Sequence, residues 1–93
     1  MTERNFLGNK NHREFIGFGW QALSSFKSLV VVKVGKQLYF GSDVNYGRTT
    51  VRYVNAFTYT TKEQREAMLK DGKALPITKE LVTKLGLPKD LKI

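Results

Sequence analysis

Residues 29–40, LVVVKVGKQLYF, decide the fold that we expect for this chain. The first half, residues 29–34, is β-branched and almost continuously apolar, which predicts a strand that is covered on both faces. Gly35 followed by Lys36 fits a two-residue hairpin turn with glycine in the first position. Residues 37–40 then return as the partner strand, so this stretch predicts a β-hairpin.

The turn also predicts the register of the hairpin. It places Val32 opposite Tyr39 and Val31 opposite Phe40. Both are pairs of a β-branched and an aromatic residue, which are favoured across antiparallel strands.

Towards the N-terminus, residues 14–20 favour a strand, with Gly17 and Gly19 marking a bulge or a close backbone approach. Residues 22–28 indicate a turn or a single helical turn. Residues 1–13 are polar and rich in asparagine, and we expect a flexible N-terminal arm there, with a first strand as the alternative. The folded domain is then a single α+β unit over residues 14–93.

After the hairpin, residues 41–49 contain the Gly, Ser, Asp and Asn that are typical of a loop. Residues 50–59 alternate in character, with Tyr53, Phe57 and Tyr59 on one side of the pattern. This alternation predicts a long strand whose aromatic face points inward.

At Thr60 the period of the sequence changes to that of helices. Capping boxes at Thr60 and Thr61 predict a helix to about residue 71, which Gly72 can end. A second helix is predicted from its N-cap at Thr78 to its end at Gly86. The expected fold class is α+β: a small antiparallel sheet of three to four strands in the N-terminal two-thirds, covered by two short C-terminal helices.

The charge of the chain favours polyanionic partners. Sixteen Lys and Arg oppose eight Asp and Glu, which gives a formal net charge of +8. The partner that we expect is therefore nucleic acid, DNA or RNA, or an acidic protein surface. Small basic domains also use such charge for solubility alone.

Several chemistries have no support in the sequence. There is no cysteine, so disulfides, thiol nucleophiles and thiolate metal sites are excluded. His12 is the sole histidine, and we expect it in the N-terminal arm rather than in a catalytic triad. No metal-ligand spacing and no phosphate-binding loop is present, so we expect no enzyme and no cofactor. No apolar run approaches the length of a membrane span, no signal-peptide core follows the N-terminus, and the expected location is the cytoplasm.

The candidate contacts lie where basic and aromatic residues alternate. We expect the cations of the central segment to meet phosphates and Tyr46 or Trp20 to stack on a base, with Arg13 as a further contact. Alternatively, the cations form a solvent-exposed rim that protects a sheet edge from pairing, and the aromatic rings pack in the core. The central cations are Lys33, Lys36, Arg48 and Arg52.

Two function classes remain open. The first is a small non-enzymatic nucleic-acid-binding protein. The second is a compact inhibitor or adaptor, of the kind that phages or mobile elements use, which docks on an acidic surface of a larger and possibly nucleic-acid-processing host complex. Self-assembly through a sheet edge is a lesser alternative.

Overall fold

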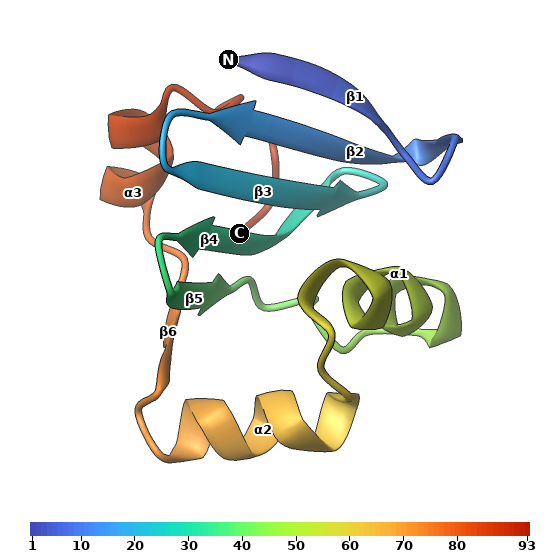
Figure 1. The fold of residues 1–93 in the computed structure, drawn as a ribbon, viewed down its shortest axis with the longest axis vertical. Coiled ribbons are helices and arrows are strands. Elements are labelled where there is room, and N and C mark those ends of the chain that lie inside the picture. The colour runs from blue at the N-terminus through green and yellow to red at the C-terminus, as the bar shows by residue number, and fades with distance from the viewer.

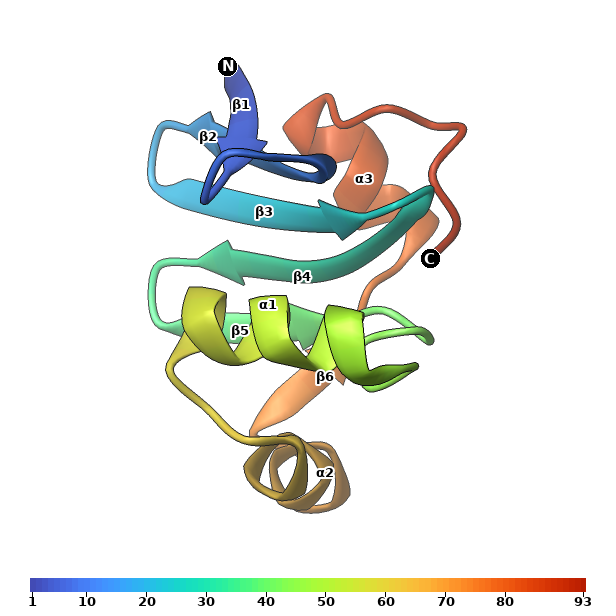
Figure 2. The ribbon, with the colours of Figure 1, turned by 90° about the vertical axis from the view of Figure 1, so that its right-hand side faces the viewer.

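The computed structural model describes residues 1–93 and contains one six-stranded sheet in the order β1-β2-β3-β4-β5-β6. The first five strands form an antiparallel meander, and β6 adds to β5 in parallel. Helices α1 and α3 lie on opposite sides of the sheet, while α2 lies beyond the β6 edge (Figures 1 and 2). The strands are β1 (Thr2–Phe6), β2 (Asn9–Gly17), β3 (Trp20–Ser25), β4 (Ser28–Val34), β5 (Gln37–Phe40) and β6 (Ala74–Pro76), and the helices are α1 (Arg48–Thr58), α2 (Lys62–Lys70) and α3 (Lys79–Leu85).

The α+β class is confirmed, but the sheet is larger and mixed, and there are three helices instead of two. The central hairpin matches its prediction in detail. Val32 pairs with Tyr39 and Val31 with Phe40. Gly35 opens the turn with a φ of 59°, a backbone conformation that glycine adopts without strain.

The N-terminal residues belong to strands β1 and β2 and do not form a flexible arm. Strand β1 is polar because it is an edge strand, and two ion pairs attach it to β2. Glu3 pairs with Arg13 at 3.0 Å, and Arg4 pairs with Glu14 at 2.9 Å. A polar edge carries no hydrophobic alternation, so sequence patterns do not reveal it.

The glycine-rich segment forms the tight end of the β2–β3 hairpin. Gly19 has a φ of 79°, and the Trp20 ring lies directly over Gly17, where a Cβ atom would approach the ring to 2.1 Å. Residues 22–28 are predicted as a turn or a single helical turn, but β3 continues through residue 25. The chain reverses only at Phe26, whose φ is 55°.

Residues 50–59 were predicted as a strand, and this was wrong. They form most of α1, because Thr50, Val54 and Phe57 recur at the spacing of one helical face. Thr50 and Val54 are buried against the sheet, while Tyr59 is exposed. The β-branched residues made the stretch resemble a strand, and packing against the sheet overrides that weak preference.

Both predicted C-terminal helices are confirmed at their ends. Helix α2 begins with a reciprocal capping box in which Gln64 N–H donates to Thr61 Oγ1 at 3.2 Å and Thr61 N–H donates to Gln64 Oε1 at 2.8 Å. Helix α3 begins at the N-cap Thr78, which accepts from Leu81 N–H at 3.2 Å, and it ends at Gly86 in the left-handed conformation. Strand β6 between these helices was missed, since three residues ending in proline give no strand signal.

The two sides of the sheet bury separate apolar clusters. The α3 side packs Phe15, Ala22, Leu29, Val32, Ile77, Val82 and Leu87. The α1 side packs Leu23, Val30, Val31, Phe40, Val44, Val54 and Ala74. The sheet is thus covered on both faces, which explains the almost unbroken apolar run of β4. None of the helices has the length and apolar character needed to cross a membrane.

Candidate nucleic-acid interface

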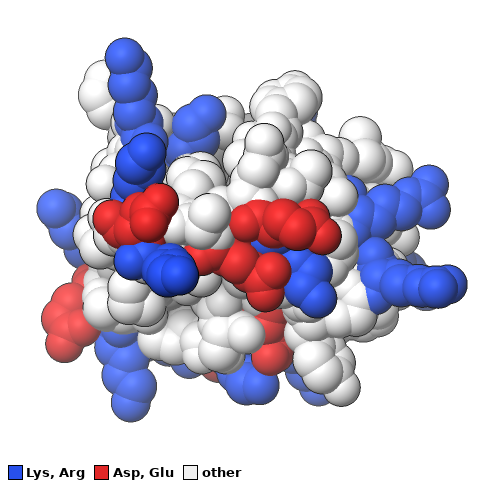
Figure 3. Space-filling view, turned by 90° about the horizontal axis from the view of Figure 1, so that it is seen from below, with Lys and Arg blue, Asp and Glu red and all other residues white.

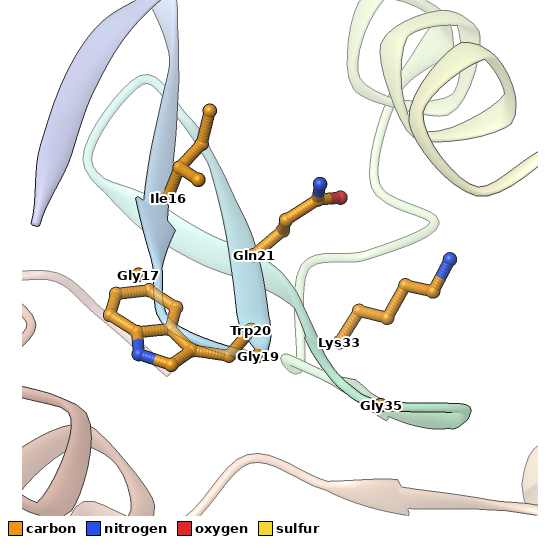
Figure 4. A pocket seen from close by; sticks show the side chains of 7 residues that line it. All are labelled: Ile16, Gly17, Gly19, Trp20, Gln21, Lys33 and Gly35. Atoms are coloured by element: carbon orange, nitrogen blue, oxygen red, sulfur yellow. The ribbon is translucent and has the colours of Figure 1, made fainter.

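Three of the predicted cations lie on one side of the molecule. Lys33 pairs across the strands with Gln21 and Leu38, and Leu38 packs into the cluster on the α1 side. Lys33 therefore projects on the α1 side of the sheet, which Figure 4 shows. Arg48 and Arg52 are exposed and four residues apart, so they follow one another along the outer surface of α1. We call these three residues, Lys33, Arg48 and Arg52, the basic face.

No carboxylate neutralises the basic face. The three ion pairs of the molecule are Arg4–Glu14, Arg13–Glu3 and Lys92–Asp43, and none includes a residue of the basic face. Glu14 lies on the α1 side of β2, but it is buried and already bonded to Arg4 at 2.9 Å. No acid occurs in residues 44–62. The positive charge of this side is therefore free to meet a polyanion.

The surface that holds α2 is different in character. Seen from below in Figure 3, acidic side chains gather in the middle of the surface, and Lys and Arg side chains surround them. A mixed arrangement of this kind cancels much of its own field at short range. A polyanion would therefore meet acids on the α2 surface that are absent from the basic face.

A buried polar network attaches α1 to the sheet. Ser25 Oγ lies 3.1 Å from His12 Nε2 and 2.8 Å from Thr50 Oγ1 of α1. The His12 ring stacks on Tyr53 with the centroids 3.8 Å apart, and Asn9 donates to the Tyr53 hydroxyl at 2.9 Å. His12 is fully buried, contrary to its expected place in a mobile arm, and this burial lowers its pKa.

The contact between His12 and Ser25 has the length of a nucleophile–base hydrogen bond. However, both residues are buried, so a substrate has no access to the serine. His12 Nδ1 has no hydrogen-bonding partner in the chain, so no carboxylate orients the ring as in a catalytic triad. We therefore interpret the pair as a structural link between β2, β3 and α1.

Arg65, on α2, joins three segments around α1. It is fully buried and donates to Asn45 Oδ1 at 2.9 Å, Asn55 Oδ1 at 2.8 Å and the Thr60 carbonyl at 2.8 Å. Burial lowers the pKa of the guanidinium, while the nearby charges of Glu63 and Glu66 oppose that shift. No local sequence pattern marks Arg65 as buried, because its partners are 5 to 20 residues away.

The other predicted contacts lie elsewhere. Arg13 is on the α3 side, where it pairs with Glu3. Trp20 is half-buried and packs against the α3-side cluster, on the opposite face of the sheet from Lys33 (Figure 4). Tyr46 is exposed in the loop before α1, beside an open hollow of about 660 Å³ that Lys62, Glu66 and Leu69 also line. Lys36 is exposed at the tip of the β4–β5 hairpin.

One shallow hollow lies at the hairpin end of the sheet. It has a volume of about 230 Å³ and opens beside Lys33 (Figure 4). The residues that line it are Ile16, Gly17, Gly19, Trp20, Gln21, Lys33 and Gly35. None of them is acidic, so this end continues the electrostatic character of the basic face.

No protein-family model matches the chain, and no significant match is found among characterised proteins or solved structures.

Proposed function

We propose that the protein is a small non-enzymatic nucleic-acid-binding domain that uses its α1 side. The observation that carries this proposal is the basic face: Lys33, Arg48 and Arg52 are exposed, unpaired and on one side of the sheet. The one acid of the sheet on that side, Glu14, is buried and paired. Exposed cations without competing carboxylates are what phosphate contacts require.

The basic face is suited to the phosphate backbone rather than to reading a sequence. Lysine and arginine at the surface of a rigid scaffold displace condensed counterions when they meet phosphates. Each contact contributes about −0.7 to −0.9 to the slope of log K against log salt concentration. Phosphate contacts of this kind position a ligand and carry no base specificity.

The proposal is tested with two charge-matched variants. K33Q/R48Q/R52Q removes three positive charges from the basic face, and K79Q/K84Q/K89Q removes three exposed charges from the α3 region. Fluorescence anisotropy of labelled DNA and RNA at about 50 and 200 mM salt gives affinities and salt slopes. We expect the first variant to flatten the slope by about 2 to 3, and the second to change it by less than about 1.

Two results would contradict the proposal. The first is that the wild-type protein binds no nucleic acid at low salt. The second is that both variants weaken binding equally. Equal weakening would mean that diffuse charge, and not the basic face, attracts the polymer.

The second candidate is a compact inhibitor or adaptor that docks on an acidic protein surface. The observation that favours it is exposed Tyr46 beside the hollow that Leu69 and Ile77 line, because aromatic residues next to apolar hollows are frequent anchors of protein interfaces. In that case Tyr46→Ala abolishes partner binding, while removal of single cations of the basic face changes mainly the association rate. A protein partner recovered with the wild type and lost with Tyr46→Ala would favour this candidate.

A further inference from the structure

Phe18 is the most exposed large apolar side chain of the protein. It stands between Gly17 and Gly19 at the tip of the β2–β3 hairpin and is fully exposed to solvent. Neither of the two apolar clusters includes Phe18. Exposure alone does not indicate a ligand, because single apolar side chains are common at protein surfaces. Whether Phe18 meets a ligand therefore depends on what surrounds it.

The backbone around Phe18 is held in place from two directions. The Trp20 ring lies on Gly17 so closely that any side chain at position 17 would collide with it. Gly35 N–H of the adjacent hairpin donates to the Gly19 carbonyl at 3.1 Å. Since the tip is fixed before a ligand arrives, little conformational entropy is lost when the ring makes contact.

Two cations lie near the hairpin that carries Phe18. Lys33 lines the same hollow as Gly17 and Gly19, and no acid lines it. Lys36 is at the tip of the adjacent hairpin, next to the Gly35 that bonds to Gly19. A fixed aromatic ring beside cations matches a nucleobase with its neighbouring phosphates, whereas a purely apolar protein pocket would gain nothing from the lysines.

We propose that the nucleic acid is single-stranded, and that one unpaired base stacks on Phe18 while Lys33 and Lys36 contact the adjacent phosphates. A duplex keeps its bases stacked within the helix, so a ring on a hairpin tip reaches a base face only in a single strand or an unpaired end. This inference rests on the proposed function and extends it, because Lys33 belongs both to the basic face and to the hollow that Gly17 and Gly19, the neighbours of Phe18, also line.

The test compares Phe18→Leu with Phe18→Trp. Leucine keeps an apolar side chain without a ring, and tryptophan keeps a ring with a larger stacking surface. The probes are labelled single-stranded DNA and RNA of about 10 nucleotides and a hairpin duplex of the same composition, a length within the range that stacking platforms cover. Since Phe18 makes no core contact, equal unfolding midpoints in urea confirm that both variants fold.

We expect Phe18→Leu to weaken single-strand binding about ten- to hundredfold with an unchanged salt slope, because stacking on one base is lost while phosphate contacts remain. Phe18→Trp should bind the single strand at least as well as the wild type, and duplex binding should be the same for all three proteins.

The outcomes separate the two proposals. If the wild type binds none of the probes, the proposed function fails and this inference fails with it. If the wild type binds and Phe18→Leu binds the single strand equally well, only the role of Phe18 is overturned. If Phe18→Leu weakens the single strand and the duplex equally, the strand preference is overturned. If Phe18→Leu loses capture of a protein while nucleic-acid binding is intact, Phe18 is a protein anchor and the inference is wrong.

Discussion

The two sides of the sheet are stabilised by different kinds of contact. The α3 side is an apolar cluster, and the helix that covers it has an N-cap at Thr78 and a glycine end at Gly86. The α1 side adds buried polar groups, and its helix begins at Gly47 with no side-chain cap and no acid in the first turn. Local signals therefore specify the α3 side, whereas long-range polar contacts hold α1.

This difference has a consequence for function. A helix held by contacts on its inner face is free to present any residue on its outer face, and α1 presents Arg48 and Arg52 there. On the α3 side, Arg13 and Glu3 neutralise each other. The side with fewer local folding signals thus presents arginines that no carboxylate pairs, whereas the free charges on the α3 side are lysines such as Lys79 and Lys84.

The largest expected effect concerns Arg65. Arg65→Ala leaves Asn45, Asn55 and the Thr60 carbonyl without their shared donor, and we expect a loss of about 3 kcal/mol in the free energy of unfolding. The control is Arg48→Ala, an exposed arginine whose removal should change stability by less than about 0.5 kcal/mol. Urea denaturation measures both, and a loss below about 1 kcal/mol for Arg65→Ala would contradict the role that we assign to Arg65.

The second prediction concerns pH. Because burial lowers the pKa of His12, the folded protein binds fewer protons than the unfolded chain in mildly acidic solution. Stability from neutral His12 is therefore complete above the ordinary histidine pKa of about 6.5 and is lost as the pH falls below it. The groups in contact with the ring are Ser25, Tyr53 and Phe26, which are neutral in this pH range, so burial governs the shift.

The measurement for His12 is the free energy of unfolding of the wild type and of His12→Gln between pH 7 and pH 5. Glutamine keeps a polar end group but does not titrate. The wild type should lose more stability than the variant, by up to about 1.4 kcal/mol for each unit by which the folded pKa is lowered. Parallel curves for the two proteins would show that His12 does not couple α1 to pH.

A smaller effect is expected on the α3 side. Thr78→Ala removes the acceptor for Leu81 N–H at the start of α3 and should cost about 1 kcal/mol. The matched change on the α1 side is Gly47→Ala. It removes no capping hydrogen bond and should lower stability only because alanine is strained at the φ of 81°. If Thr78→Ala had no effect on the urea midpoint, the capping signal would not be what fixes the start of α3.

The parts of the fold that sequence reasoning predicted are those with local signals. The turn at Gly35 predicted the register of the hairpin, and the N-caps Thr61 and Thr78 predicted where α2 and α3 begin. Residues 50–59 were misassigned because the same residues satisfy a two-residue and a helical period, and only the surface against which they pack decides between the two. Strand β6 forms because it pairs with β5, and its own three residues carry no strand signal.

The candidate site was predicted in part for the same reason. Lys33, Arg48 and Arg52 were identified from composition, but whether they share a side depended on strand order and on α1 being a helix. Trp20 and Arg13 project on the other side of the sheet, which the alternation of β2 and β3 decides once the strands are known. The buried positions of His12 and Arg65 depend on partners far along the chain, so no local pattern could reveal them.

The most direct test of the central claim is a map of backbone amide chemical shifts during titration with a single-stranded oligonucleotide of about 10 nucleotides. We expect shifts at Lys33, Arg48 and Arg52 and around Phe18, with α3 unaffected. Shifts concentrated on α3, or on the acidic surface of α2, would contradict the assignment of the α1 side as the nucleic-acid interface.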